Sequence, residues 1–546
     1  MSSHMAIPEQ HNQLITQPHG RLHAIIIGGS ITGLSAAIAL RRAGFRVNVL
    51  EKDVTVTEEL DGGCRIAPNL YKILRGWDLE SELRKVSSKP ETINMLSYES
   101  GSYLGSIRWD REVLKETDGE FGLTTYSALR SLLHREAVSQ GVCVQFGAKV
   151  VALETRSSSP SVTLEDGEIL RADLLVGADG VNGLTREYIS THGSPLETQQ
   201  TSPSRKRTYK GVETGERTEG LKLEMFSVSI PKNLILDNSQ LAYLITRREN
   251  DMFVWLGHER SAIGFPSGQS GDFSLCFYGL ELESRQTRDL HHILRGAEPS
   301  LLKLSRLASQ TSSSLKCNPI AHENVLDTWI DGSLVVIGEA AHPLPPGSAQ
   351  SCALSVEDSL VLARLFSPQN FRCPFHAPLS TPYIPALLAA FQSIRYPHCA
   401  SVQTKEVGII HYMTMPGASD AERNIRDQGM RARRDTMEIA VVPVPLEIVD
   451  YFEPDFSHDM EEENEEDDDH QVVYEPATVR HTSESAVKAD DGLEISPEWV
   501  EITEVFGYQA EDEAEEWWAT WGRYQIWTEA SEAVVDNNWT ASSKTT

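Results

Sequence analysis

Residues 23–52 read HAIIIGGSITGLSAAIALRRAGFRVNVLEK, and this stretch decides the fold of the chain. The apolar run 24–27 is short and rich in isoleucine, which predicts a buried parallel strand. After a glycine-containing turn, small apolar residues recur at helical spacing, and Gly44 ends the predicted helix. A second apolar run, 47–50, predicts another strand that places Glu51 at its carboxyl end. The stretch therefore predicts a strand–helix–strand unit.

The turn inside this unit has the features of a dinucleotide site. Gly28 permits a tight turn, a small residue at position 30 lets the backbone approach a pyrophosphate, and Gly33 lets the helix pack closely. The helix N-terminus attracts negative charge, and Glu51 can accept hydrogen bonds from both ribose hydroxyls. Ser30 replaces the second glycine of the strict pattern, but its small side chain keeps the turn feasible. The sequence thus predicts a nucleotide site near the N-terminus.

Composition narrows the class of protein. A chain of 546 residues has room for two to four domains, and a net charge of −30 argues against nucleic acid or anionic lipid as a partner. The chain has no apolar run long enough to predict a membrane span, and its first twenty residues lack the apolar centre of a secretory signal. The seven cysteines are scattered without a CxxC pair, which predicts reduced thiols, no metal site and a cytoplasmic location.

The rest of the chain adds two further turns and one apparent sheet. Strands at 174–176 and 334–337 run into Gly177-Ala178-Asp179-Gly180 and Gly338-Glu339 respectively. A glycine pair at 62–63 predicts a loop, and Asn69 is expected to cap a helix over 70–83. Alternating apolar residues predict an antiparallel sheet from four short segments, 224–230, 241–246, 252–257 and 273–278.

The C-terminal part has an unusual composition. Residues 459–469 hold nine acids in eleven positions, which predicts a disordered linker. Beyond it, Trp517, Trp518 and Trp521 lie at helical spacing, and we expect this helix to dock on the main body.

The segments 28–51, 177–180 and 338–343 occur in an order and at separations that resemble the FAD-dependent aromatic hydroxylases. This family is typified by p-hydroxybenzoate and salicylate hydroxylase, and the likeness over residues 22–435 is closest to the fungal secondary-metabolism type. The resemblance implies an α/β fold, a Rossmann-like FAD-binding domain with an inserted antiparallel-sheet substrate domain and a helical C-terminal region. The implied parts are a flexible N-terminus (1–21), an FAD-binding domain in three segments (22–90, 118–195, 320–415), a substrate domain formed by a hairpin (91–117) and a β-sheet (196–319), a helical segment (416–454), an acidic disordered linker (455–495) and a Trp-rich C-terminal helix (496–546).

The resemblance also implies which residues hold FAD. They are Gly28, Ser30, Gly33, Glu51, Gly63, Arg65, Tyr126, Asp179, Gly180, Glu339, Pro343, Gly347 and Cys352. Glu339 stands where the family has an aspartate, and Tyr126 stands where it often has an arginine, with Arg130 four residues later. His342 is expected to be structural.

The implied reaction is the hydroxylation of an aromatic, phenolic small molecule. NAD(P)H, as NADPH or NADH, reduces FAD, and O2 then forms a flavin C4a-hydroperoxide that transfers oxygen to the substrate. His258 and Arg260, in the segment WLGHER, and Tyr243 are the candidate catalytic residues that would activate the phenol. The protein is expected to act as a monomer or dimer without a metal.

Two alternatives remain open at this stage. Ser227 stands where some members bind a phenolate with arginine, which favours an epoxidase or dearomatising monooxygenase acting on a prenylated or polyketide substrate. The substitutions at positions 30, 126, 227 and 339 also allow a degenerate flavin-binding module without enzymatic activity.

Overall fold

The structure is a computed structural model that describes residues 22–55, 62–108, 111–157, 159–193, 223–246, 251–280, 293–311, 316–320, 325–367, 383–435 and 504–522. The expected N-terminal segment 1–21 and the acidic linker 455–495 lie outside the described residues.

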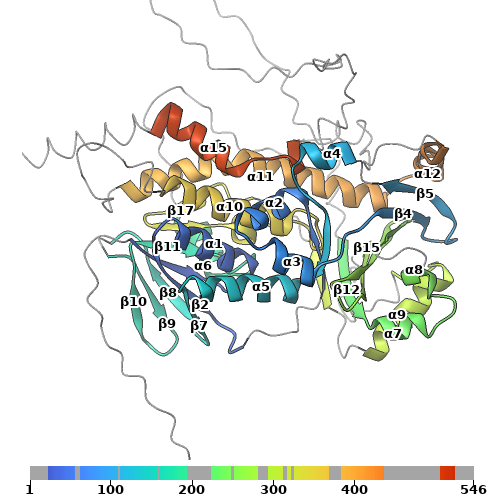
Figure 1. Cartoon of the computed structure of the whole chain (residues 1–546), viewed down its shortest axis with the longest axis horizontal. Coiled ribbons are helices and arrows are strands. Elements are labelled where there is room, and N and C mark those ends of the chain that lie inside the picture. The colour runs from blue at the N-terminus through green and yellow to red at the C-terminus, as the bar shows by residue number, and fades with distance from the viewer. Residues whose placement is uncertain are drawn as a thin grey trace, which may run out of the picture.

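A six-stranded sheet forms the centre of one half of the molecule (Figure 1). We call it the nucleotide-binding half because it contains the predicted nucleotide site. Its order is β17 (Ile330–Asp331), β18 (Leu334–Val336), β11 (Leu174–Gly177), β1 (His23–Ile27), β2 (Arg46–Glu51) and β7 (Cys143–Phe146). All neighbours are parallel except the pair β17–β18. Helix α1 (Ile31–Arg42) packs against α5 (Tyr126–Ser139) and α10 (Ser351–Leu365). This half has the predicted α/β class.

A seven-stranded sheet forms the other half. Its order is β16 (Lys316–Ile320), β12 (Leu223–Ile230), β15 (Asp272–Leu280), β14 (Arg260–Ser267), β13 (Met252–Leu256), β4 (Thr92–Ser97) and β5 (Tyr103–Arg108). Neighbours are antiparallel except for the parallel pair β13–β4. Alternation along β13 gives the sheet two apolar faces: Phe253 and Trp255 belong to one buried cluster, and Met252, Val254 and Leu256 belong to the other.

Two smaller sheets and one long helix complete the fold. A short ladder pairs β3 (Gly63–Ile66) with β6 (Gly122–Thr125), and a separate three-stranded sheet contains β8 (Val150–Glu154), β9 (Ser161–Leu164) and β10 (Ile169–Arg171). The long helix α11 (Ile384–Thr414) extends from the first half across to the second (Figure 1). The remaining elements are α2 (Pro68–Gly76), α3 (Glu80–Val86), α4 (Arg111–Glu116), α6 (Leu184–His192), α7 (Lys232–Leu236), α8 (Tyr243–Thr246), α9 (Pro299–Thr311), α12 (Asp420–Asp435), α15 (Ala510–Trp517), the 3-10 turn η1 (Gly338–Ala340) and the π turn η4 (Trp518–Gly522).

Three local expectations were wrong. The predicted helix over 70–83 is two helices, α2 and α3, because the backbone turns at Asp78, whose φ is +64°. The segment 241–246 ends in helix α8 instead of forming a strand, because Leu241, Leu244 and Ile245 are buried at the i, i+3, i+4 spacing of a helix. Asn69 does not cap a helix, since Ala67 is the N-cap of α2 and Asn69 lies inside it. The Asn69 side chain is buried and donates from Nδ2 to Gln350 Oε1 (3.0 Å) and to Glu357 Oε1 (2.7 Å).

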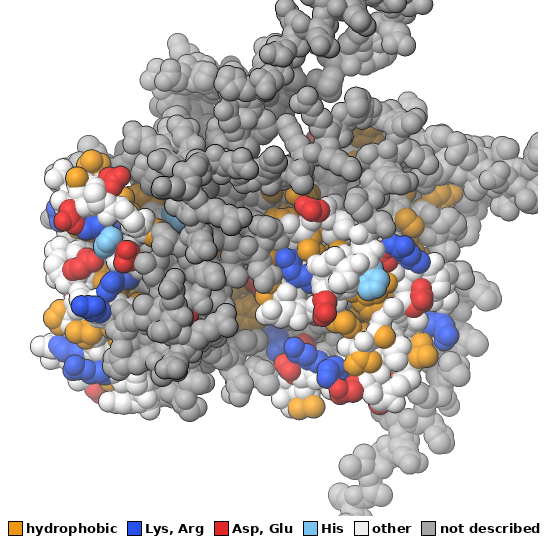
Figure 2. Space-filling model, turned by 180° about the vertical axis from the view of Figure 1, so that it is seen from behind, with side chains coloured by type: hydrophobic (Ala, Val, Ile, Leu, Met, Phe, Trp, Pro, Cys, Tyr) orange, Lys and Arg blue, Asp and Glu red, His pale blue; other side chains and the backbone are white. Residues whose placement is uncertain are grey.

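The surface of the described residues mixes both signs of charge. Figure 2 shows Lys and Arg side chains interspersed with Asp and Glu side chains on one face. Among the described residues, no helix combines the length and the apolar character that crossing a membrane requires.

Candidate cofactor and substrate site

The three glycine-containing turns meet at one edge of the six-stranded sheet. Strands β1, β11 and β18 are parallel neighbours, and Gly28, Ala178 and Ile337 follow directly at their carboxyl ends. In open α/β sheets this edge is where ligands bind. A Cβ on Gly338, whose φ is +59°, would lie 2.6 Å from the Thr32 side chain of α1, so the third turn touches the helix that follows the first. Packing of distant segments thus assembles the three motifs.

The first turn can exist only with glycine at two positions. Gly28 has φ +106°, and a Cβ there would lie 2.4 Å from the carbonyl oxygen of Ala178. A Cβ on Gly33 would lie 1.8 Å from the carbonyl oxygen of Gly28, so no larger residue allows α1 to start here. Ser30 is the N-cap of α1 but makes no side-chain capping bond, and the first turn holds no acid. The amides of this helix start therefore remain available to an anion.

Glu51 is held at the edge of this turn. Its carboxylate accepts hydrogen bonds from the backbone N–H of Gly29 (2.8 Å) and of Asp53 (3.0 Å). Arg130, on α5, pairs with Glu51 Oε2 at 3.2 Å and donates from Nε to the carbonyl of Gly29 at 2.9 Å. Both side chains are buried. Arg130, which lies four residues after the position where the family often has an arginine, thus fixes the turn and the acid together.

Asp179 stands at the second turn, close to Gly28. It accepts hydrogen bonds from the N–H of Thr185 (3.0 Å) and from the Thr185 hydroxyl, which ties it to the start of α6. Burial raises the pKa of the Asp179 carboxyl, and the bonds from Thr185 oppose that shift. Gly180 follows with φ +81°, and no atom lies within 4 Å of where its Cβ would stand. The carbonyl end of β11 is therefore open beside this residue.

Tyr126, at the start of α5, lies near Glu339 of the third turn. Glu339 is exposed, yet surrounding protein raises the pKa of its carboxyl by desolvation; Oε1 accepts from the hydroxyl of Ser351 (3.0 Å). Burial likewise raises the pKa of Tyr126, and Cys352, Glu339 and Cys64 add to that effect. Cys352 is buried, with its Sγ 3.5 Å from the Sγ of Cys64.

These features fit a dinucleotide such as FAD. Helix α10, like α1, has no capping bond from its own N-cap side chain and no acid in its first turn. Glu406 accepts from the N–H of Gln350, and the amides that follow in α10, like those of α1, can face electronegative groups. The loop before α10 is fixed by close contacts: a Cβ on Gly347 would lie 2.5 Å from the Tyr278 hydroxyl, and the buried Pro343 accepts a hydrogen bond from Gln403. A Cβ on Gly63 would lie 2.5 Å from the ring of Phe265. The two helix starts and the fixed loop before α10 are therefore suited to a cofactor of this kind.

A buried charged network supports the third turn from behind. Asp358 accepts from the N–H of Gly338 (2.9 Å), from His342 Nε2 (2.5 Å) and from Arg395 Nε (2.8 Å). Arg395 also pairs with Glu357 at 2.9 Å. The charge of Asp358 holds the pKa of His342 at about 10 against desolvation, and His342 and Arg395 hold the pKa of Asp358 at about 2. These contacts give His342 the structural role expected from the sequence.

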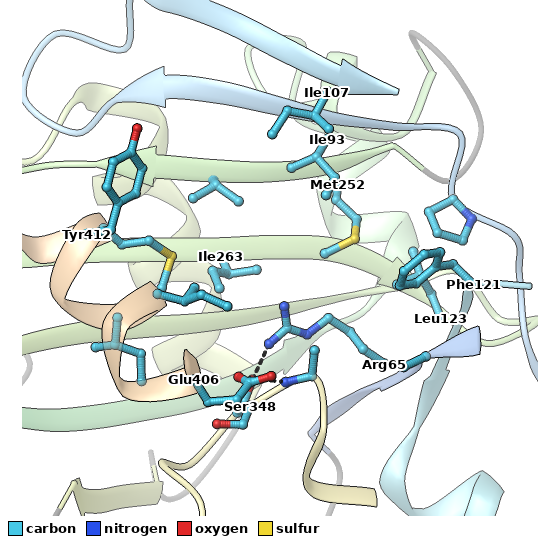
Figure 3. Close-up of a pocket in the computed structure, with 18 of the residues that line it drawn as sticks. Arg65, Ile93, Ile107, Phe121, Leu123, Met252, Ile263, Ser348, Glu406 and Tyr412 are labelled. Atoms are coloured by element: carbon cyan, nitrogen blue, oxygen red, sulfur yellow. Dashed lines mark hydrogen bonds between the residues drawn. The ribbon is translucent and has the colours of Figure 1, made fainter. Parts of the chain in front are cut away.

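A cavity lies between the seven-stranded sheet and α11. Its volume is about 190 Å³. Its walls are mainly apolar and come from β4, β5, β6, β13, β14 and α11 (Figure 3). Polar groups gather at one end, where Arg65 and Glu406 approach one another beside Ser348. Arg65 Nη2 donates to the carbonyl of Gly347, so this end abuts the loop expected to border FAD.

Glu406 is the polar group of this cavity that the sequence interpretation missed. It is 5% exposed and accepts from the N–H groups of Ala349 (3.3 Å) and Gln350 (3.2 Å). Burial raises the pKa of its carboxyl, and the charge of Arg65 opposes the shift. The available signal was an acid at helical spacing from apolar residues, since Glu406, Ile410 and Met413 share one face of α11. A buried acid with a perturbed pKa is a functional-site candidate.

The three expected catalytic residues lie elsewhere. His258 follows β13, and Arg423 donates to its Nδ1 at 3.0 Å; Arg260 donates to the carbonyls of His258 (3.1 Å) and Arg295. Tyr243 packs edge-on against Phe253, which points to the face of the sheet opposite the cavity. None of the three is among the described residues that line the cavity.

Comparison with known proteins connects this geometry to a family. Residues 21–368, more than half of the chain, match the family described as FAD binding domain. The FAD-dependent monooxygenase ptmM of Penicillium ochrochloron is 24% identical over 408 residues, covering 73% of this chain and 90% of that protein. The 6-hydroxynicotinate 3-monooxygenase of Bordetella bronchiseptica is 23% identical over 360 residues, covering 64% and 83%. The crystal structure of Klebsiella pneumoniae HpxO complexed with FAD and uric acid shares the fold, with a TM-score of 0.55 at 19% identity, covering 75% of this chain and 93% of that one.

Proposed function

The chain belongs to the FAD binding domain family and is an FAD-dependent monooxygenase; we propose that it hydroxylates a phenolic small molecule with a large apolar body. The co-substrates would be O2 and NADPH or NADH. The observation that carries the proposal is the apolar cavity with Arg65 and Glu406 at the end that abuts the FAD loop.

The residues that would hold FAD divide into two groups. The turn of Gly28, Ser30 and Gly33, with Glu51, would bind the adenosine and pyrophosphate part. A second group would surround the rest of the cofactor: Gly63, Arg65, Tyr126, Asp179, Gly180, Glu339, Pro343, Gly347 and Cys352. When bound, FAD supplies the redox chemistry by which NAD(P)H and O2 yield one oxygen atom for the substrate and one for water.

Arg65 and Glu406 would orient and activate the phenol. The guanidinium of Arg65 favours phenolate over phenol, which replaces the cation that Ser227 cannot supply. Glu406 has a raised pKa, so its carboxylate is a stronger base than an ordinary glutamate and can take the proton of the phenol hydroxyl. The apolar walls exclude water from the reacting carbon.

A second candidate function is epoxidation or dearomatisation of a prenylated or polyketide substrate. The apolar lining of the cavity and Ser227 favour it, because an alkene needs no proton removed before oxygen transfer. In that case Glu406 would contact a polar group of the substrate without acting as a base. The likeness to a Penicillium enzyme supports a role in secondary metabolism for either function. A degenerate, non-enzymatic module is disfavoured, since the relatives that the chain matches over most of its length are named monooxygenases.

The test is NAD(P)H oxidation by the purified, FAD-loaded chain. We expect 4-n-alkylphenols to stimulate it, and Glu406→Gln to lower the stimulated rate while leaving the bound FAD unchanged. Stimulation by prenylated aromatics alone, unaffected by Glu406→Gln, would favour epoxidation. If none of these compounds raises the rate although FAD is bound, the proposed substrate class is wrong.

A further inference from the structure

The C-terminal segment 504–522 reaches the apolar cavity. Phe506 is one of the residues that line it, and its ring contacts that of Phe121, another lining residue, edge-on at 5.1 Å between centroids. In Figure 1 the red C-terminal segment runs along α11 towards α4, above the centre of the molecule. A residue close to the end of the chain thus forms part of a wall otherwise made by the sheet, α11 and their loops.

The backbone that directly follows Phe506 is attached to the nucleotide-binding half. Lys72, on α2, donates from Nζ to the carbonyls of Gly507 (3.3 Å) and Tyr508 (3.0 Å). The Tyr508 ring stacks on His398 at 3.7 Å with an interplanar angle of 15°, and the guanidinium carbon of Arg395 lies 5.3 Å from the same ring. These contacts fix the residue that is two positions from Phe506.

The helix after this contact is also docked. Ala510, Ala514 and Trp518 are buried in the core cluster of the nucleotide-binding half. Trp518 Nε1 donates to the carbonyl of Leu365 at 3.2 Å, and Glu515 pairs with Arg364. Trp521, in contrast, is 59% exposed. Attachment on this side shows that the position of Phe506 is set by the fold.

The helix that holds the segment also lines the cavity. Arg395 and His398 lie on α11, which further along contributes Glu406, Ile410 and Met413 to the cavity wall. Because one helix carries the attachment site and the polar end of the cavity, the distance between Phe506 and Glu406 is fixed by a rigid element. A wall fixed in this way limits an apolar group that extends from Arg65 and Glu406 towards Phe506.

We propose that Phe506 determines substrate specificity by limiting the length of the apolar portion that fits in the cavity. This inference rests on the proposed function, in which the phenol lies at the polar end. It assigns the C-terminal segment to the substrate site, with Tyr508 and Lys72 as positioning residues. The substrate class is a phenol with an extended hydrocarbon group that reaches the Phe506 ring.

The experiment measures equilibrium binding of 4-n-alkylphenols of increasing length to the FAD-loaded full chain by calorimetry. Each buried methylene should raise the affinity about fourfold, until the alkyl group meets the wall and the gain stops. In Phe506→Ala the gain in affinity should continue to longer alkyl groups, because removal of the phenyl ring leaves space for additional methylenes. In Phe506→Trp it should stop at shorter chains, which gives a second variant of opposite sign if the first does not fold.

Trp521→Ala is the matched control, since it removes an exposed aromatic side chain of the same segment and should leave the length limit unchanged. The proposal is overturned if the limit is the same in the wild type and both Phe506 variants, or if no alkylphenol binds. NAD(P)H oxidation, measured with the same series, separates the two claims. A length limit that moves without any stimulated oxidation would refute the proposed function and leave the role of Phe506 intact.

Discussion

Replacing Glu51 by glutamine tests the nucleotide site most closely. The carboxylate accepts from Gly29 N–H and Asp53 N–H and pairs with buried Arg130. In Glu51→Gln the amide oxygen can keep one backbone bond, but the NH2 group then faces another donor. We therefore expect the free energy of unfolding of the FAD-free protein to fall by about 1–3 kcal/mol, the cost of one unsatisfied buried donor.

The effect on FAD affinity is separate and larger. A hydrogen bond to a charged group contributes about 1.5–3 kcal/mol and a neutral one about 0.5–1.5 kcal/mol, so two ribose hydroxyls would lose about 2–3 kcal/mol together. That loss corresponds to an affinity lower by about 30- to 140-fold. FAD at 100 times the wild-type Kd should stabilise the wild type by about 2.7 kcal/mol, and a variant with 100-fold weaker binding by about 0.4 kcal/mol.

The assay is a flavin-fluorescence titration together with denaturant unfolding, each with and without FAD. Glu154→Gln, an exposed acid on β8, is the control and should behave like the wild type. If Glu51→Gln bound FAD as tightly as this control, Glu51 would not be a ligand of the cofactor and the placement of the adenosine would be wrong.

Three further predictions concern other parts of the site. Glu406→Gln should lower substrate-stimulated turnover by about 10²-fold or more at unchanged FAD content, because a positioned base is removed; a turnover equal to that of the wild type would contradict this role. His342→Gln should lower the free energy of unfolding by about 3 kcal/mol near pH 6. Because the folded-state pKa of His342 is raised from 6.5 to about 10, this stabilisation is full below pH 6.5 and is lost as the pH rises towards 10. The free energies of unfolding of the wild type and the variant, measured by denaturation, should therefore converge near pH 10. A difference that does not depend on pH would refute the ion pair. Gly33→Ala should abolish FAD binding, since its Cβ would lie 1.8 Å from a backbone oxygen, and normal FAD content in this variant would show that the turn has another shape.

The nucleotide-binding half could be predicted because its information is local. Strand, turn, helix and acid follow one another within residues 23–51, and the right order of glycine-containing turns places three motifs at one sheet edge. A pattern of this kind can be recognised in the sequence without knowledge of long-range packing. The fungal-type monooxygenase family followed from the same three motifs and is the one that the comparisons support.

The substrate cavity could not be predicted in this way, because its residues come from segments hundreds of positions apart. Arg65 and Glu406 meet only when α11 packs across the seven-stranded sheet. The spacing of apolar residues along the sequence also does not indicate which helix covers which face of a strand. It therefore favoured His258 and Tyr243, although Tyr243 lies in helix α8 and packs on the far face.

The measurement that tests the account most directly is product analysis after turnover with isotopically labelled O2. The purified, FAD-loaded chain would be supplied with NAD(P)H and the alkylphenol that binds most tightly. The account predicts a product that carries one labelled oxygen atom on the aromatic ring. Consumption of NAD(P)H without any labelled product, although FAD and the phenol are both bound, would contradict it.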